Sequence, residues 1–231
     1  MIYIDQTKDS IRDCLSLPVI LPLGSVEQHG GHLPLSTDTA TSSKVVEEAE
    51  QHSPNTMITL PVQWVGHAGE HMAFPGTLSI SQATLASYLE DILRSLEHSG
   101  FSKLIIVNSH GGNDILLDKL VRSWSGNIKL IIYDVWSKEA DELGAELFGG
   151  SDNHAGDTES SVMATIRPDL VKNQVITNGY VEPAESTSDS PLNMSENGVD
   201  NFKPDIIIDR KKAEPILEQM VIDFIRFVDS V

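Results

Sequence analysis

The sequence contains one cysteine, few basic residues and no long hydrophobic run. Because Cys14 has no partner among the 231 residues, an internal disulfide is excluded, and we expect a reducing, cytoplasmic location. Lysine and arginine total 16 against 34 acidic residues, and the net charge of −18 disfavours nucleic acid and anionic membranes as partners. No apolar stretch reaches the ~20 residues of a membrane-spanning helix. The N-terminus lacks a signal-peptide pattern.

Hydrophobic residues make up 40% of the chain, and no repeat or long linker divides it, so we expect one domain over residues 1–231. The run Lys103–Asn108 is mostly apolar, as in parallel strands that are covered on both faces. Alternating strands and helices predict an α/β fold, a three-layer α/β/α sandwich with a mostly parallel central sheet. The expected strands are Val19–Leu23, Met57–Val62, Leu104–Asn108 and Ile128–Asp134, and the expected helices are about Thr39–Gln51, Gln82–Ser99, Asn113–Trp124 and Ala213–Val228.

A polar stretch over residues 177–205 interrupts this alternation. It is rich in serine, glutamate, asparagine and proline. A disordered linker has such a composition, but its place between structured segments also suits a lid or a contact between subunits. The sequence leaves both interpretations open.

Potential metal ligands are densest directly after the first expected strand. In an extended chain, Glu27 and His29 point to the same face, roughly 7 Å apart. Asp38 follows nine residues after His29, where a helix is expected to begin. The carboxyl end of a strand is where open α/β sheets bind ligands, so these residues favour a divalent-metal site. The plainer interpretation is that they are solvated side chains around a turn.

Two further loops carry the same chemistry. His110 closes the most apolar strand, and the glycines after it allow backbone to approach a ligand closely, which makes Gly111 a candidate substrate contact. In the second loop, Asp157 or Thr158 is expected to cap a helix and to place Glu159 in its first turn. Glu159 could also be an ordinary charge at a helix N-terminus.

These loops together supply mixed imidazole and carboxylate ligands, which suit Zn, Mn or Fe(II). Three carboxylates carry a formal charge of −3, more than one divalent ion balances, so we expect two metal ions that share a bridging carboxylate. A water between them would be acidified to a hydroxide nucleophile. The candidate ligands are Glu27, His29, Asp38, His110 and Glu159.

Four motifs occur in order along the chain: Gly24-Ser-Val-Glu27-Gln-His29-Gly-Gly-His32-Leu-Pro-Leu-Ser-Thr-Asp38, Phe74-Pro-Gly-Thr-Leu78, Asn108-Ser-His110-Gly-Gly-Asn113 and His154-Ala-Gly-Asp-Thr-Glu159-Ser160. With these motifs the chain resembles the creatininase (creatinine amidohydrolase) family from about Leu17 to Ile166. The resemblance implies an α/β/α fold, a two-metal centre that attacks amide bonds, and hexamers built as trimers of dimers. It assigns Glu27 and His110 to one metal, His29 and Glu159 to the other, and Asp38 to the bridge.

The chain departs from creatininase proper at two places. Where that enzyme has an acidic ligand two residues after the histidine matching His110, this chain has Gly112, and Glu159 is the candidate substitute. Where it has a Trp-Asp pair, this chain has Gly150 and Ser151. Relatives with the Gly-Gly loop include formamide-cleaving enzymes and a peptide-processing hydrolase of cofactor maturation.

The sequence therefore predicts an amidohydrolase with two divalent metal ions, acting on a small amide or formamide and assembled as a homohexamer. The alternatives are a peptidase-like hydrolase that trims a short peptide and a non-catalytic metal-binding protein. His154, five residues before Glu159, is the expected proton shuttle to the leaving nitrogen. His71 is the competing choice for that role and a candidate substrate contact.

Overall fold

A four-stranded parallel sheet runs through the molecule in the order β2-β1-β3-β4. We analysed a computed structural model, which describes residues 1–54, 56–172, 198–200 and 205–231. In register, Val19 lies opposite Ile58 on one side and Leu104 on the other. The strands are β1 (Val19–Leu23), β2 (Ile58–Thr59), β3 (Lys103–Asn108) and β4 (Lys129–Asp134).

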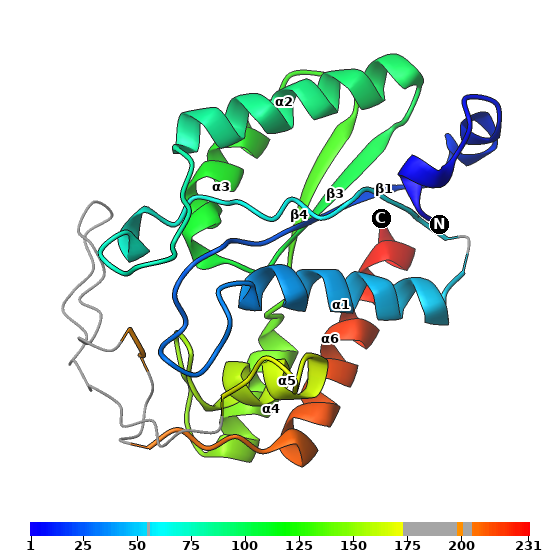
Figure 1. Ribbon diagram of the computed structural model, residues 1–231. Coiled ribbons are helices and arrows are strands. Elements are labelled where there is room, and N and C mark those ends of the chain that lie inside the picture. Colours follow the sequence, from blue (N-terminus) through cyan, green and yellow to red (C-terminus); the bar gives the residue numbers. More distant parts are fainter. Residues whose placement is uncertain (55, 173–197, 201–204) are drawn as a thin grey trace.

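Helices cover both faces of this sheet (Figure 1). One layer contains α2 (Gln82–Ser99) and α3 (Asp114–Ser123). The other contains α1 (Thr37–His52), α4 (Lys138–Phe148), α5 (Asp157–Ile166) and α6 (Arg210–Ser230). Short 3-10 turns lie at Tyr3–Asp5, Ser10–Cys14, Gly69–His71 and Gly111–Asn113. The predicted three-layer sandwich is confirmed.

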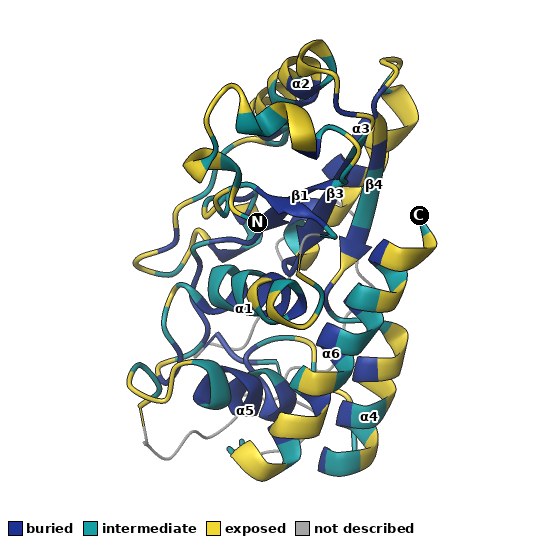
Figure 2. Ribbon diagram, turned by 90° about the vertical axis from the view of Figure 1, so that its right-hand side faces the viewer, coloured by how far each residue is buried: buried dark blue, intermediate teal, exposed yellow. Residues whose placement is uncertain are grey.

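The central strands are buried on both sides (Figure 2) because their alternate side chains enter two different cores. Ile105 and Val107 of β3 pack in the core that contains α6, where Phe224 is fully buried. Leu104 and Ile106 pack in the core formed with α2 and α3. This division explains why β3 has no polar face. Among the described residues, no helix has the length and apolarity needed to cross a membrane.

The predicted elements differ from the observed ones in three places. The strand predicted over Met57–Val62 forms a regular ladder with β1 only at Ile58–Thr59, and Pro61, which has no backbone N–H, lies two residues after its end. Helix α4 was not predicted, although Ser137 caps its N-terminus and Gly149 ends it with a φ of 80°. The polar stretch predicted over residues 177–205 is not one of these differences, because it lies almost entirely outside the described residues.

The third difference is the cap of α5. Neither Asp157 nor Thr158 caps this helix, because both already lie within its first turn and Gly156 holds the N-cap position. The side chain of Asp152 accepts a hydrogen bond from the Thr158 backbone N–H at 3.0 Å instead. The cap therefore comes from outside the helix, six residues upstream of Thr158.

Candidate metal centre

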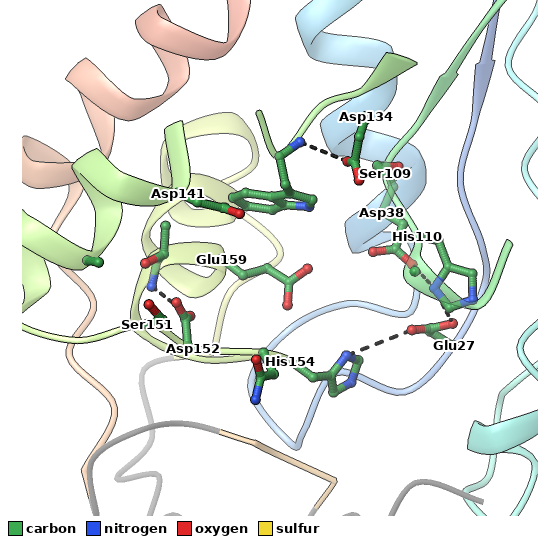
Figure 3. A pocket seen from close by; sticks show the side chains of 15 residues that line it. Glu27, Asp38, Ser109, His110, Asp134, Asp141, Ser151, Asp152, His154 and Glu159 are labelled. Carbon is green, nitrogen blue, oxygen red and sulfur yellow. Dashed lines mark hydrogen bonds and ion pairs between the residues drawn. The ribbon is translucent and has the colours of Figure 1, made fainter. Parts of the chain in front are cut away.

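A cavity of about 340 Å³ opens at the carboxyl ends of β1, β3 and β4 (Figure 3). Parallel strands bring their carboxyl ends to one edge of a sheet, so loops that are far apart in the sequence meet there. The lining residues are Glu27, Asp38, Ser109, His110, Gly111, Asp134, Trp136, Asp141, Ala145, Ser151, Asp152, Asn153, His154, Thr158 and Glu159.

All five candidate metal ligands lie together, and all but His29 line this cavity. Glu27 and His29 follow β1, and Asp38 lies in the first turn of α1. His110 follows β3, and Glu159 lies in the first turn of α5. All but Glu159 are at most 5% exposed. We call these five residues the inner set.

Gly24 allows two of these segments to meet. A Cβ atom at this position would lie 2.5 Å from the backbone nitrogen of Thr39, so only glycine lets the end of β1 approach the start of α1 so closely. This approach brings Asp38 beside Glu27. The Ser25 hydroxyl lies 2.6 Å from a carboxylate oxygen of each, and because it has one proton it can donate to only one of them at a time.

His110 faces two carboxylates with one ring nitrogen and a backbone carbonyl with the other. Its Nδ1 lies 3.1 Å from Glu27 Oε2 and 3.4 Å from Asp38 Oδ2. Its Nε2 donates to the carbonyl oxygen of His67 at 2.8 Å. Metal-ligating histidines typically donate their second nitrogen in this way, which leaves the first free to bind.

His29 has the same arrangement on the other side of Asp38. Its Nε2 lies 3.3 Å from Asp38 Oδ1 and 3.4 Å from Glu159 Oε1. Its Nδ1 lies 3.2 Å from the carbonyl oxygen of Glu27. The other oxygen of Glu159 accepts a hydrogen bond from the Ala155 backbone N–H at 2.6 Å. Asp38 thus turns one oxygen toward each imidazole.

The inner set fits metal binding on two observations. Two ligand atoms at about 2.0–2.1 Å from a tetrahedral zinc ion lie about 3.4 Å apart, close to the nitrogen–oxygen separations around Asp38. In addition, His29 Nε2 is buried and has no hydrogen-bond partner among the described residues. A buried polar atom without a partner is costly, and a cation would supply the missing contact. The groups Glu27–Asp38–His110 and His29–His154–Glu159 each bring three ligand atoms within 4.8 Å of one another.

Proximity shifts the pKa values of the inner set in ways that match a cation site. Burial opposes the charged form of His110, but Glu27 and Asp38 outweigh it and raise its pKa to about 9. The pKa of His29 is also raised, because Glu159 and Asp38 outweigh its burial. The pKa of Asp38 is lowered despite burial, since His29 and His110 favour its charged form. Positive charge beside these carboxylates is therefore strongly stabilising.

His154 and His71 occupy a different environment from the two imidazoles of the inner set. Burial lowers the pKa of His154 to about 4 and that of His71 to about 2. His154 lines the cavity, with Nδ1 3.9 Å from Glu27 Oε1. His71 Nε2 lies 3.1 Å from the same oxygen, but His71 is not among the described residues that line the cavity. Gly111 does line it.

The structure also explains the departure at Gly112. A Cβ atom there would lie 2.3 Å from both Glu70 Oε1 and His110 Nε2, so this loop has no room for a side chain at that position. Glu159 supplies a carboxylate next to His29 from another element. Of the two residues at the Trp-Asp position, Ser151 lines the cavity.

Four further residues that line the cavity were missed by sequence reasoning. We call Asp134, Trp136, Asp141 and Asp152 the outer wall. Asp134 and Asp141 are exposed, and Asp152 is half-buried. Although Asp134 is exposed as a whole residue, desolvation of its carboxylate against the cavity wall raises its pKa to about 7, and burial raises the pKa of Asp152 to about 6. Asp134 is the last residue of β4, at the same sheet edge as His110, so the strand-end argument that found His110 could have found it.

The charge of the cavity restricts what can enter. Its lining contains six carboxylates and, among the described residues, no lysine or arginine. Two divalent ions carry +4 against −6 on the six carboxylates, so up to two negative charges of the outer wall would remain, and fewer at pH 7, where Asp134 with its pKa of about 7 is about half protonated. The cavity therefore disfavours anionic substrates and accommodates neutral or cationic ones.

Comparisons with known proteins agree with this geometry. A family profile described as "Creatininase: Creatinine amidohydrolase" matches residues 6–228. The chain is 36% identical over 169 residues to a mycofactocin precursor peptide peptidase of Mycolicibacterium smegmatis, covering 71% of this chain. That match spans 64% of the peptidase. The creatinine amidohydrolase of Pseudomonas putida is 30% identical over 178 residues, which cover 69% of this chain and 66% of that protein.

Solved structures show the same fold. A point mutant of creatininase superposes with a TM-score of 0.79 at 23% identity, covering 99% of this chain and 98% of that one. A putative creatinine amidohydrolase from Bacteroides fragilis gives a TM-score of 0.75 at 22% identity, covering 99% and 94%. At these identities the likeness establishes the arrangement of the sheet and helices.

Proposed function

The chain belongs to the creatininase family, and on that premise we propose that it is a metal-dependent amidohydrolase with two divalent ions held by the inner set. The observation that carries this proposal is the position of Asp38. Its two carboxylate oxygens face His110 and His29 at 3.4 and 3.3 Å, as a bridging ligand between two ions requires. Glu27 would complete one site with His110, and Glu159 the other with His29.

Bound divalent ions, here Zn, Mn or Fe(II), would acidify a water and polarise the substrate carbonyl. The protein's own residues would do the rest. His154 lies on the cavity wall and is neutral at pH 7, so it could accept the proton released by the attacking water and then pass it to the leaving nitrogen. Gly111, which carries no side chain, leaves space beside His110 for the substrate. The outer wall favours a neutral or cationic group on that substrate.

For the substrate we propose a small amide or formamide, because the cavity is at the small end of the range for ligand pockets. A second candidate is the trimming of a short peptide. The similarity to the mycofactocin precursor peptide peptidase favours it. The exposed Asp134 and Asp141 also leave the outer side open to a longer chain.

The test combines metal analysis with a substrate panel. Protein stripped with a chelator and reloaded with Zn or Mn should bind two equivalents by elemental analysis. The reloaded protein should then hydrolyse at least one of creatinine, N-formylated amines and short peptides, with no activity in the stripped protein. One equivalent at saturation would remove the bridging role of Asp38, and two equivalents without turnover on the panel would favour a non-catalytic metal-binding protein.

We also propose a homohexamer in a cytoplasmic setting. Family resemblance supports the hexamer, as do four exposed apolar residues on the loops after β1 and β2, namely Leu35, Trp64, Met72 and Leu78. The single buried thiol of Cys14 supports the reducing location. Light scattering at micromolar concentration should give several times the 25.3 kDa chain mass, and a monomer would contradict the assembly.

A further inference from the structure

Gln28 lies between two residues of the inner set and contacts both remaining histidines of the site. We propose that it is a positioning residue that holds His71 and His154 each with the ring proton on Nε2. Its side chain acts on His71 and its backbone carbonyl on His154. Gln28 is 5% exposed, so water does not compete for these contacts.

The orientation of the Gln28 amide follows from a backbone donor. The Gly30 N–H lies 3.0 Å from one terminal atom of the side chain, and an N–H can only donate, so that atom is Oε1. Gly198 covers the same oxygen, since a Cβ atom there would lie 1.9 Å from it. The amide nitrogen, which can only donate, therefore faces the histidines.

This orientation determines the tautomer of His71. Gln28 Nε2 lies 3.0 Å from His71 Nδ1, so this ring nitrogen must accept and carries no proton. In neutral His71 the proton is then on Nε2, which lies 3.1 Å from Glu27 Oε1 and donates to it. His71 is thereby a donor that orients Glu27, and its ring proton is not available to a substrate.

The backbone carbonyl of Gln28 determines the tautomer of His154. His154 Nε2 lies 2.8 Å from this oxygen and 3.1 Å from the Gln28 amide nitrogen. The carbonyl oxygen can only accept and the amide nitrogen can only donate, so Nε2 can satisfy only one of these two contacts. We assign the ring proton from the shorter contact, in which Nε2 donates to the carbonyl oxygen. The unprotonated Nδ1 is then directed toward Glu27 Oε1, 3.9 Å away, as Figure 3 shows.

The consequence for catalysis rests on the proposed function. A proton shuttle needs a lone pair that faces the reacting atoms, and Gln28 presents His154 Nδ1 in that state before the substrate binds. The two tautomers themselves do not depend on any activity. They can therefore be measured even if no substrate is found.

The experiment is solid-state ¹⁵N NMR of the zinc-loaded full chain with ¹⁵N-labelled histidine, because ring-nitrogen shifts distinguish N–H from bare nitrogen at any assembly size. The two rings are assigned with His71→Asn and His154→Asn. We expect both rings to carry the proton on Nε2. Gln28→Glu, which keeps the size and the Gly30 contact but replaces the donor with a carboxylate, should add a proton at His71 Nδ1 while Nε2 keeps its proton toward Glu27, and should leave His154 unchanged.

Gln63→Glu is the matched control, because Gln63 Nε2 donates only to the Val65 carbonyl and contacts no imidazole in the described residues. It should leave both rings as they are. A wild-type proton on Nδ1 of either ring would overturn the proposal, as would a His71 ring unaffected by Gln28→Glu. The wild-type spectrum alone decides the tautomers if the variant does not fold. Absent hydrolysis would count against the proposed function and leave this result intact.

Discussion

The inner set and the outer wall both contribute aspartates to the cavity, but the pKa values of Asp38 and Asp134 are shifted in opposite directions. Asp38 is buried between two imidazoles, and its pKa is lowered because their positive charge outweighs burial. Asp134 is more exposed, yet its pKa is raised to about 7, since burial of its carboxylate and the nearby Asp114 and Asp141 all oppose its charge. For these two aspartates, pairing with imidazole outweighs depth in the protein. The pKa of Glu27 is raised, because burial and the neighbouring Asp38 outweigh His110 there.

The histidines divide in the same way. His29 and His110 each face two carboxylates, and their pKa values are raised. His71 and His154 contact the amide and the carbonyl of Gln28, and their pKa values are lowered. The first pair thus belongs to a charged centre, and the second pair is neutral and held in place beside it.

The largest expected effect tests the inner set directly. Asp38→Asn removes the charge between the two imidazoles, so we expect at most one metal equivalent. Turnover should fall by more than ~10⁴-fold, beyond the range that acid–base groups contribute. Asp134→Asn, the same substitution on the outer wall, should keep two equivalents. Elemental analysis of both variants checks this, and two equivalents in Asp38→Asn would erase the distinction between the two regions.

A smaller effect is expected at the histidine that borders both regions. His154→Asn should keep both metals and lower kcat by ~10²–10⁴-fold, because a proton must reach the leaving nitrogen. His71→Asn is the control, and its effect on kcat should be smaller, since His71 reaches the site only through Glu27. Loss of metal in His154→Asn would make this residue a ligand, and unchanged turnover would transfer its role to His71.

The smallest effect concerns stability and the outer wall alone. A carboxylate whose pKa is raised by folding destabilises the folded state as pH rises from its unfolded value of ~4 through its folded value. For Asp134 that folded value is about 7. Asp134→Asn should therefore raise the free energy of unfolding at pH 8 by less than ~1 kcal/mol, since solvent screens this exposed group.

At pH 5 the same substitution should have a smaller effect, because Asp134 is then largely protonated in the folded protein. Urea unfolding of both proteins at the two pH values measures the difference. A gain that is equal at pH 5 and pH 8 would show that Asp134 ionises normally, and the contrast with Asp38 would then be smaller than we describe.

The sequence by itself was enough to predict the sheet, most of the helices and the grouping of the inner set. Alternate burial along a strand and capping residues such as Ser81 are local patterns, and strand ends gather at one edge whatever the details of packing. Helix α4 carries similar local signals in Ser137 and Gly149, so it was within reach as well.

Only the tertiary structure decided which atoms face one another. The cap on α5 comes from Asp152, the space at Gly112 is taken by Glu70, and the outer wall joins residues from three segments. Gln28 and His154 lie 126 positions apart, and a contact of 2.8 Å between them sets a tautomer. A sequence pattern reports on neighbours along the chain, whereas hydrogen bonds and pKa values depend on distances of a few ångströms that are set when the whole chain packs.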